Sequence, residues 1–129
     1  MPPIAVSLDH AEPAVGIVGL AGEHDAYSAD RLANELGLLL ESDADVAVDL
    51  SDATFIDSQT LSVLLSARHR ADVAQLGFTL VLPDGNYTQV HRILRMTGLG
   101  SWFATCPTHE RAVAAARAGH SAGDRLKVA

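Results

Sequence analysis

Short apolar runs alternate with longer segments of helical periodicity along nearly the whole chain, and this alternation limits the folds it can adopt. Strands are expected at residues 4–8, 15–20, 45–50, 78–82 and 102–105, and helices at 28–40, 58–75, 87–96 and 107–118. The first two strands follow one another directly, which predicts a hairpin. Each later strand is separated from the next by a helix, which favours parallel pairing.

The predicted fold class is therefore α/β, with a mixed, mostly parallel sheet packed with four helices. At 129 residues the chain is long enough for one core and short for two. We expect a single domain over residues 1–118. Residues 119–129 are polar, charged and small, and predict a flexible C-terminal tail.

Composition excludes several classes of function. The net charge of −7 disfavours direct binding to nucleic acid. Cys106 is the single cysteine, and no apolar run is long enough for a membrane helix, so the expected location is the cytoplasm. Neither a Gly-x-Ser-x-Gly elbow nor a phosphate-binding loop is present, and the six histidines lack metal-binding spacing. No catalytic residue, metal site or cofactor is expected, and the chain is predicted not to be an enzyme.

One helix start stands out as a candidate functional site. Asp57 and Ser58 open the helix predicted at 58–75, and both residue types are preferred helix caps. Asp25 and Asn86 also follow predicted strands. Because the ends of parallel strands meet at one edge of a sheet, Asp25, Asp57 and Asn86 are expected near Ser58. Asp25 and Asp57 are candidates to orient the serine hydroxyl or to help hold a magnesium ion, while Asn86 is more simply read as a helix cap.

Three motifs in order resemble the STAS family. Residues 46–50 (VAVDL) and 55–58 (FIDS), followed by a leucine-rich helix, are similar to the STAS strand that ends in an aspartate–serine pair at the start of a helix. Residues 86–99 (NYTQVHRILRMTGL) resemble the family's penultimate helix, which closes in Thr-Gly-Leu. Residues 20–25 (LAGEHD) resemble its turn after the second strand. The similarity spans residues 4–118.

This resemblance, to bacterial anti-sigma-factor antagonists in particular, implies a function in partner switching. The unphosphorylated form binds an anti-sigma factor, which is also a serine kinase; phosphorylation of Ser58 breaks the complex, and a phosphatase restores it. The implied partner-binding residues are Asp25, Asp57, Ser58, Gln59, Thr60 and Asn86, and a homodimer is compatible with the sequence.

The chain departs from the family at Thr60, where glycine is usual in the first turn of the helix. Threonine adds a branched side chain and a second hydroxyl. This leaves an alternative open: a STAS scaffold or small-ligand-sensing module in a larger regulatory complex that is never phosphorylated. In that case Asp57 and Ser58 serve only to cap the helix.

Overall fold

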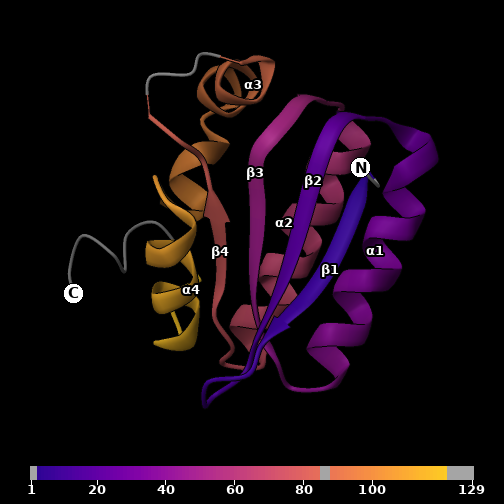
Figure 1. Cartoon of the computed structure of the whole chain (residues 1–129). Coiled ribbons are helices and arrows are strands. Elements are labelled where there is room, and N and C mark those ends of the chain that lie inside the picture. The colour runs from indigo at the N-terminus through magenta and orange to yellow at the C-terminus, as the bar shows by residue number, and fades with distance from the viewer. Residues whose placement is uncertain (1–2, 85–87, 122–129) are drawn as a thin grey trace.

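A five-stranded sheet with strand order β1-β2-β3-β4-β5 forms the centre of the computed structural model, which describes residues 3–84 and 88–121 (Figure 1). The strands are β1 (Ile4–Asp9), β2 (Val15–His24), β3 (Asp45–Ile56), β4 (Phe78–Val81) and β5 (Ala104–Cys106). β1 pairs antiparallel with β2, and all other pairs are parallel. The predicted hairpin and mostly parallel sheet are confirmed.

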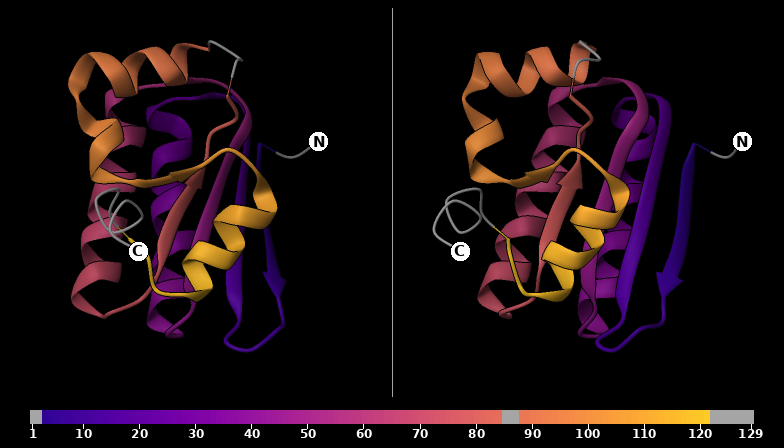
Figure 2. Two further views of the ribbon diagram at one scale, coloured as in Figure 1. Left: turned by 90° about the vertical axis from the view of Figure 1, so that its left-hand side faces the viewer. Right: turned by 60° about the vertical axis from the view of Figure 1, so that its left-hand side comes forward.

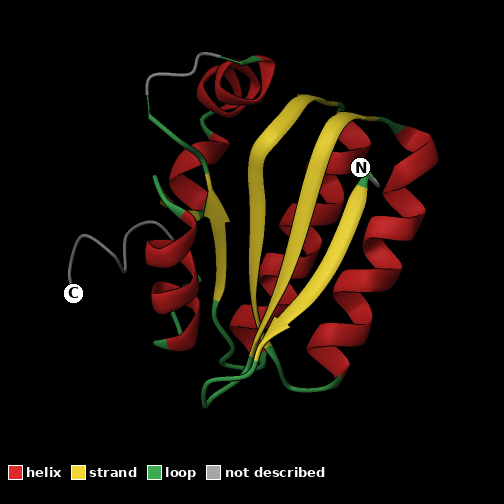
Figure 3. Ribbon diagram, viewed as in Figure 1, coloured by secondary structure: helices red, strands yellow, loops and turns green. Residues whose placement is uncertain are grey.

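Four α-helices cover the two faces of the sheet unequally (Figures 2 and 3). They are α1 (Ala26–Glu41), α2 (Ser58–Val73), α3 (Gln89–Thr97) and α4 (His109–Arg117), with a 3-10 turn, η1 (Leu99–Trp102), after α3. α1 and α2 lie against one face and α4 against the other, while α3 crosses the carboxyl end of the sheet.

Successive side chains of a strand point to opposite faces of the sheet, and the buried apolar residues therefore form two clusters. On β3, Val46, Val48 and Leu50 join the larger cluster under α1 and α2, whereas Ala47 joins the smaller cluster under α4. The fit against α4 is close at Gly77, where an added Cβ atom would lie 1.9 Å from the carbonyl oxygen of Ala116. Glycine is therefore required at this approach of helix to sheet.

Two strands are longer than the sequence predicts, and this positions the site. β2 was expected to end at residue 20 and β3 at residue 50, but both continue to His24 and Ile56. Two register shifts between them, at Gly19/Ala21 and Gly22/Glu23, keep the pairing in place through the polar stretch. Gly22 has a φ of +76°, which glycine adopts without strain.

Three smaller expectations at the C-terminal side are corrected. Trp102 lies in η1 rather than on the last strand, with its side chain 56% exposed over Arg68. Helix α4 begins at His109, because Thr108 caps it. Residues 119–121, expected in a flexible tail, pack on the fold: the Phe78 N–H donates to the His120 carbonyl over 2.8 Å. The rest of the predicted tail lies outside the described residues.

Candidate functional site

The carboxyl ends of β2 and β3 lie side by side and start two helices. His24 is paired with Ile56, and the N–H of Asp57 donates to the His24 carbonyl over 3.1 Å. Asp25 and Asp57 each follow directly as the cap of α1 and of α2. The structure therefore places both aspartates at one edge of the sheet, as the sequence predicts. The ends of β2 and β3 that they follow lie side by side at the top of Figure 1.

Both carboxylates act as helix caps. The Asp25 carboxylate accepts the Tyr27 N–H over 2.9 Å, and the Asp57 carboxylate accepts the Thr60 N–H over 2.8 Å. Asp25 is exposed and Asp57 is half-buried. Among the described residues no three His, Cys, Asp or Glu side chains form a group able to hold a metal ion, so these two carboxylates alone do not make a metal site.

Ser58 is the first residue of α2 and its side chain is exposed. The capping is done by Asp57, so the serine hydroxyl is not needed for it; in the described part of the chain the hydroxyl makes no hydrogen bond. No acidic residue occupies the first turn of α2. Ser58 therefore lies at the positive end of the helix dipole, where the first N–H groups of a helix are free, and such a position stabilises an anion.

Gln59 and Thr60 have opposite placements. Gln59 is exposed beside Ser58, as expected for a partner-binding residue. Thr60 is fully buried, and its hydroxyl donates to the His24 carbonyl over 3.2 Å. The expectation that Thr60 lies on the partner surface is corrected, because its side chain points into the fold. Its replacement of glycine consequently adds no bulk to the exposed surface beside Ser58.

Asn86, the remaining predicted site residue, lies outside the described residues. The cap of α3 is instead Thr88, whose backbone N–H donates to Nδ1 of His91 over 3.3 Å. Nε2 of His91 donates to the Pro83 carbonyl over 2.8 Å, which fixes the ring.

The sequence did not single out two polar residues that hold this edge together. His24 is completely buried; its Nε2 donates to the Ala21 carbonyl over 3.0 Å, and its Nδ1 lies 3.1 Å from the Ser28 hydroxyl. Gln89 accepts the Ile56 N–H over 2.9 Å and donates to the Ile56 carbonyl over 3.0 Å. Gln89 thereby takes the place of a neighbouring strand at the end of β3 and fixes α3 beside the start of α2.

Two aromatic side chains are exposed close to the ends of β2 and β3 along the chain. Tyr27, in the first turn of α1, is 97% exposed, and Phe55, next to last on β3, is 39% exposed. Glu23 is paired with Phe55 and is exposed, as is Asp25. Aromatic residues of this kind are enriched at protein–protein interfaces. The edge at which β2 and β3 end and α1 and α2 begin thus carries exposed acidic and aromatic side chains.

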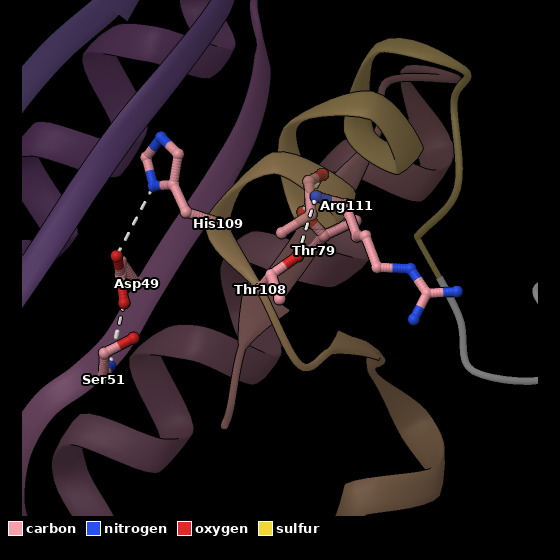
Figure 4. Close-up of polar contacts among 7 residues, drawn as sticks. Asp49, Ser51, Thr79, Thr108, His109 and Arg111 are labelled. Atoms are coloured by element: carbon pink, nitrogen blue, oxygen red, sulfur yellow. Dashed lines mark hydrogen bonds and ion pairs between the residues drawn. The ribbon is translucent and has the colours of Figure 1, made fainter. Parts of the chain in front are cut away.

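A second polar cluster lies on the α4 face (Figure 4). Asp49 Oδ2 is 3.5 Å from His109 Nδ1, and Asp49 Oδ1 accepts the Ser51 N–H over 2.8 Å. In Figure 4 the Ser51 hydroxyl lies on the far side of Asp49 from the imidazole. Serine and histidine therefore do not form the nucleophile–base pair of a hydrolase. Nearby, the buried Thr79 hydroxyl donates to the Ala112 carbonyl over 2.8 Å, which fastens α4 to the sheet.

Comparison with known proteins identifies the family. The family model described as "Mlab, STAS domain" matches residues 7–105. The chain therefore belongs to the STAS domain family. The described helices include none with the length and apolar character needed to span a membrane. No curated protein matches the chain in sequence.

Solved structures agree with this assignment. An anti-sigma factor antagonist from Mycobacterium paratuberculosis is similar at 25% identity and a TM-score of 0.72, over 88% of this chain and 94% of that one. A Thermotoga maritima protein has 21% identity and a TM-score of 0.71, over 87% and 94% of the two chains. The Bacillus cell fate determinant SpoIIAA in its phosphorylated form has 17% identity and a TM-score of 0.61, over 85% and 97%. At their lower identities, the last two show the shared fold alone.

Proposed function

We propose that this chain is an anti-sigma-factor antagonist whose binding to an anti-sigma factor is switched off by phosphorylation of Ser58. The observation that carries the proposal is an exposed serine at the first position of α2, whose hydroxyl makes no hydrogen bond to a described residue and is not needed for the cap that Asp57 provides. Support for the partner class comes from STAS family membership and from the similarity to the Mycobacterium paratuberculosis antagonist.

The physical basis of the switch is a difference between host and partner. A phosphate on Ser58 adds about −1.5 to −2 charges next to the free N–H groups of α2, so the fold of the antagonist tolerates it. A partner that packs over the same hydroxyl must instead bury the dianion. An unpaired charge buried at an interface costs several kcal/mol, which is enough to dissociate a complex.

The proposed partner surface consists of Asp25, Tyr27, Phe55, Ser58 and Gln59, all of which are exposed. The aromatic rings supply apolar contact area close to the phosphorylated position, so phosphate interrupts contacts that contribute strongly to binding. In this proposal the chain is regulatory and carries out no catalysis; the chemistry belongs to the kinase and the phosphatase.

The test is phosphate transfer from ATP by the anti-sigma factor kinase encoded in the same genome. Intact-mass measurement and peptide mapping should find one added phosphate, on Ser58, and none on Ser58→Ala. The kinase is first shown to be active by its own hydrolysis of ATP. Transfer to another residue, or no transfer by an active kinase, overturns the phosphorylation switch and favours a STAS scaffold that is never phosphorylated.

A further inference from the structure

The outer edge of β1 offers a second binding surface, far along the sheet from β4 and β5. β1 is the first strand in the sheet order, so only β2 pairs with it within the described part of the chain. In the right-hand view of Figure 2, β1 stands at the right-hand margin, with no further described strand beyond it. An uncovered strand edge presents unpaired backbone N–H and C=O groups to other chains.

The register identifies the backbone groups that point outward. Ala21 N–H donates to the Pro3 carbonyl over 3.0 Å, so Pro3 faces β2. Backbone polar groups alternate along an antiparallel strand, and the pairing is regular over Ile4–Asp9. Ile4, Val6 and Leu8 therefore direct their N–H and C=O groups away from β2, toward the free edge.

The same three residues make the edge apolar. Their side chains share the face of the sheet that packs on α1. Ile4 is buried there, but Val6 is 42% and Leu8 is 47% exposed. No lysine, proline or charged residue interrupts residues 4–8, although natural edge strands use such residues to prevent pairing. Residues 4–8 therefore lack these protecting residues, which occur only at the two ends of the strand, as Pro3 and Asp9.

We propose that this edge binds a second copy of the chain through antiparallel pairing of β1 with β1 about a two-fold axis at Val6. In this register Val6 pairs with its own symmetry mate, and Ile4 pairs with Leu8 of the other copy. The outward backbone groups are then satisfied in both directions, and the exposed valine and leucine side chains pack together. A single strand supplies both halves of such an isologous interface.

Charge favours a second copy at this edge over other parts of the surface. The chain carries a net charge of −7, so most faces of two copies repel each other. Residues 4–8 are uncharged, and Asp9 at the end of β1 is already paired with Arg117 at 2.8 Å. This inference does not depend on Ser58 or on the proposed function.

Analytical ultracentrifugation of the full chain over a concentration series tests the proposal. The mass should approach twice 13.6 kDa for the parent. Val6→Lys, which places two like charges across the axis, should sediment as a 13.6-kDa monomer. Val73→Lys is the matched control, because Val73 is 72% exposed on α2, away from β1. The Val73→Lys protein should remain dimeric.

A second variant tests the register and does not depend on the folding of the lysine variant. Paired residues across a β-sheet lie about 5.5 Å apart at Cα, within the range that a disulfide spans. Val6→Cys should therefore form a disulfide-linked dimer in oxidised glutathione, while Val73→Cys should not. A parent that stays monomeric at every concentration overturns the proposal. So does a Val6→Lys chain that remains dimeric, or a Val6→Cys chain that does not cross-link.

Discussion

Replacing Gln89 with alanine should loosen the edge that presents Ser58. The amide of Gln89 makes two hydrogen bonds to Ile56, at 2.9 and 3.0 Å, and no strand of the described chain pairs with β3 on that side at this point. Each net hydrogen bond contributes about 0.5–1.5 kcal/mol. Gln89 is half-buried, so water partly replaces the lost amide. We expect Gln89→Ala to lower the free energy of unfolding by about 1–2 kcal/mol.

The assay combines thermal unfolding with amide hydrogen exchange. For a chain of this size about 1 kcal/mol corresponds to roughly 4 °C in Tm, so Gln89→Ala should lower Tm by about 4–8 °C. Exchange of the Ile56 amide should also become faster, because its acceptor is removed. Met96→Ala is the matched control on the same helix, since the Met96 side chain is 79% exposed.

A specific outcome would refute this reasoning. If Gln89→Ala and Met96→Ala unfold at the same temperature and Ile56 exchanges at the parent rate, the amide does not act as a substitute strand. The position of α3 beside Ser58 would then have to depend on its apolar contacts alone.

Two further predictions concern the stability of the fold. Gly77→Ala should lower the free energy of unfolding, measured in urea, by at least about 3 kcal/mol, because the new Cβ atom would lie 1.9 Å from the Ala116 carbonyl oxygen. Gly100→Ala, whose Cβ atom would meet only ordinary contacts, is the control, and equal losses in the two variants would contradict the argument. Burial raises the pKa of the Asp45 carboxyl, so the free energy of unfolding should fall as pH rises from below the ordinary pKa of 3.8 through the raised pKa of the folded state. Asp45→Asn keeps an acceptor for the Gly77 N–H and should lack this fall. Parallel pH profiles of the parent and the variant would contradict the prediction.

The main features of the fold follow from local patterns, and the missing parts follow from contacts that local patterns do not contain. Apolar alternation predicts the paired cores of β2 and β3. The predicted strand stops at residue 50, and residues 51–54 after it are polar or small. In the structure β3 continues through them, because β2 pairs with it through two register shifts. That pairing depends on residues more than 30 positions away along the chain.

In the candidate site, too, local patterns predict some residues, while residues that depend on distant contacts are missed. Asp57 and Ser58 were predicted from helix-start chemistry, which is local, and the structure places them at the start of α2. Gln89 and His24 were not predicted, because they bond to backbone groups that any sequence would supply. Thr60 was placed on the surface by analogy with glycine, but a threonine with a buried acceptor available turns inward.

The most direct test of the proposed switch is a calorimetric titration of the anti-sigma factor with three versions of the chain. Ser58→Ala should bind within about twofold of the parent, since the change removes one exposed neutral hydroxyl and adds neither charge nor bulk. Ser58→Asp should bind at least about a hundredfold more weakly, because a charge buried at the interface costs several kcal/mol at about 1.4 kcal/mol per factor of ten. Its Tm should stay close to the parent value, because an acidic residue is favourable at a helix N-terminus. Equal affinities for Ser58→Asp and Ser58→Ala would contradict the account, because the start of α2 would then lie outside the interface.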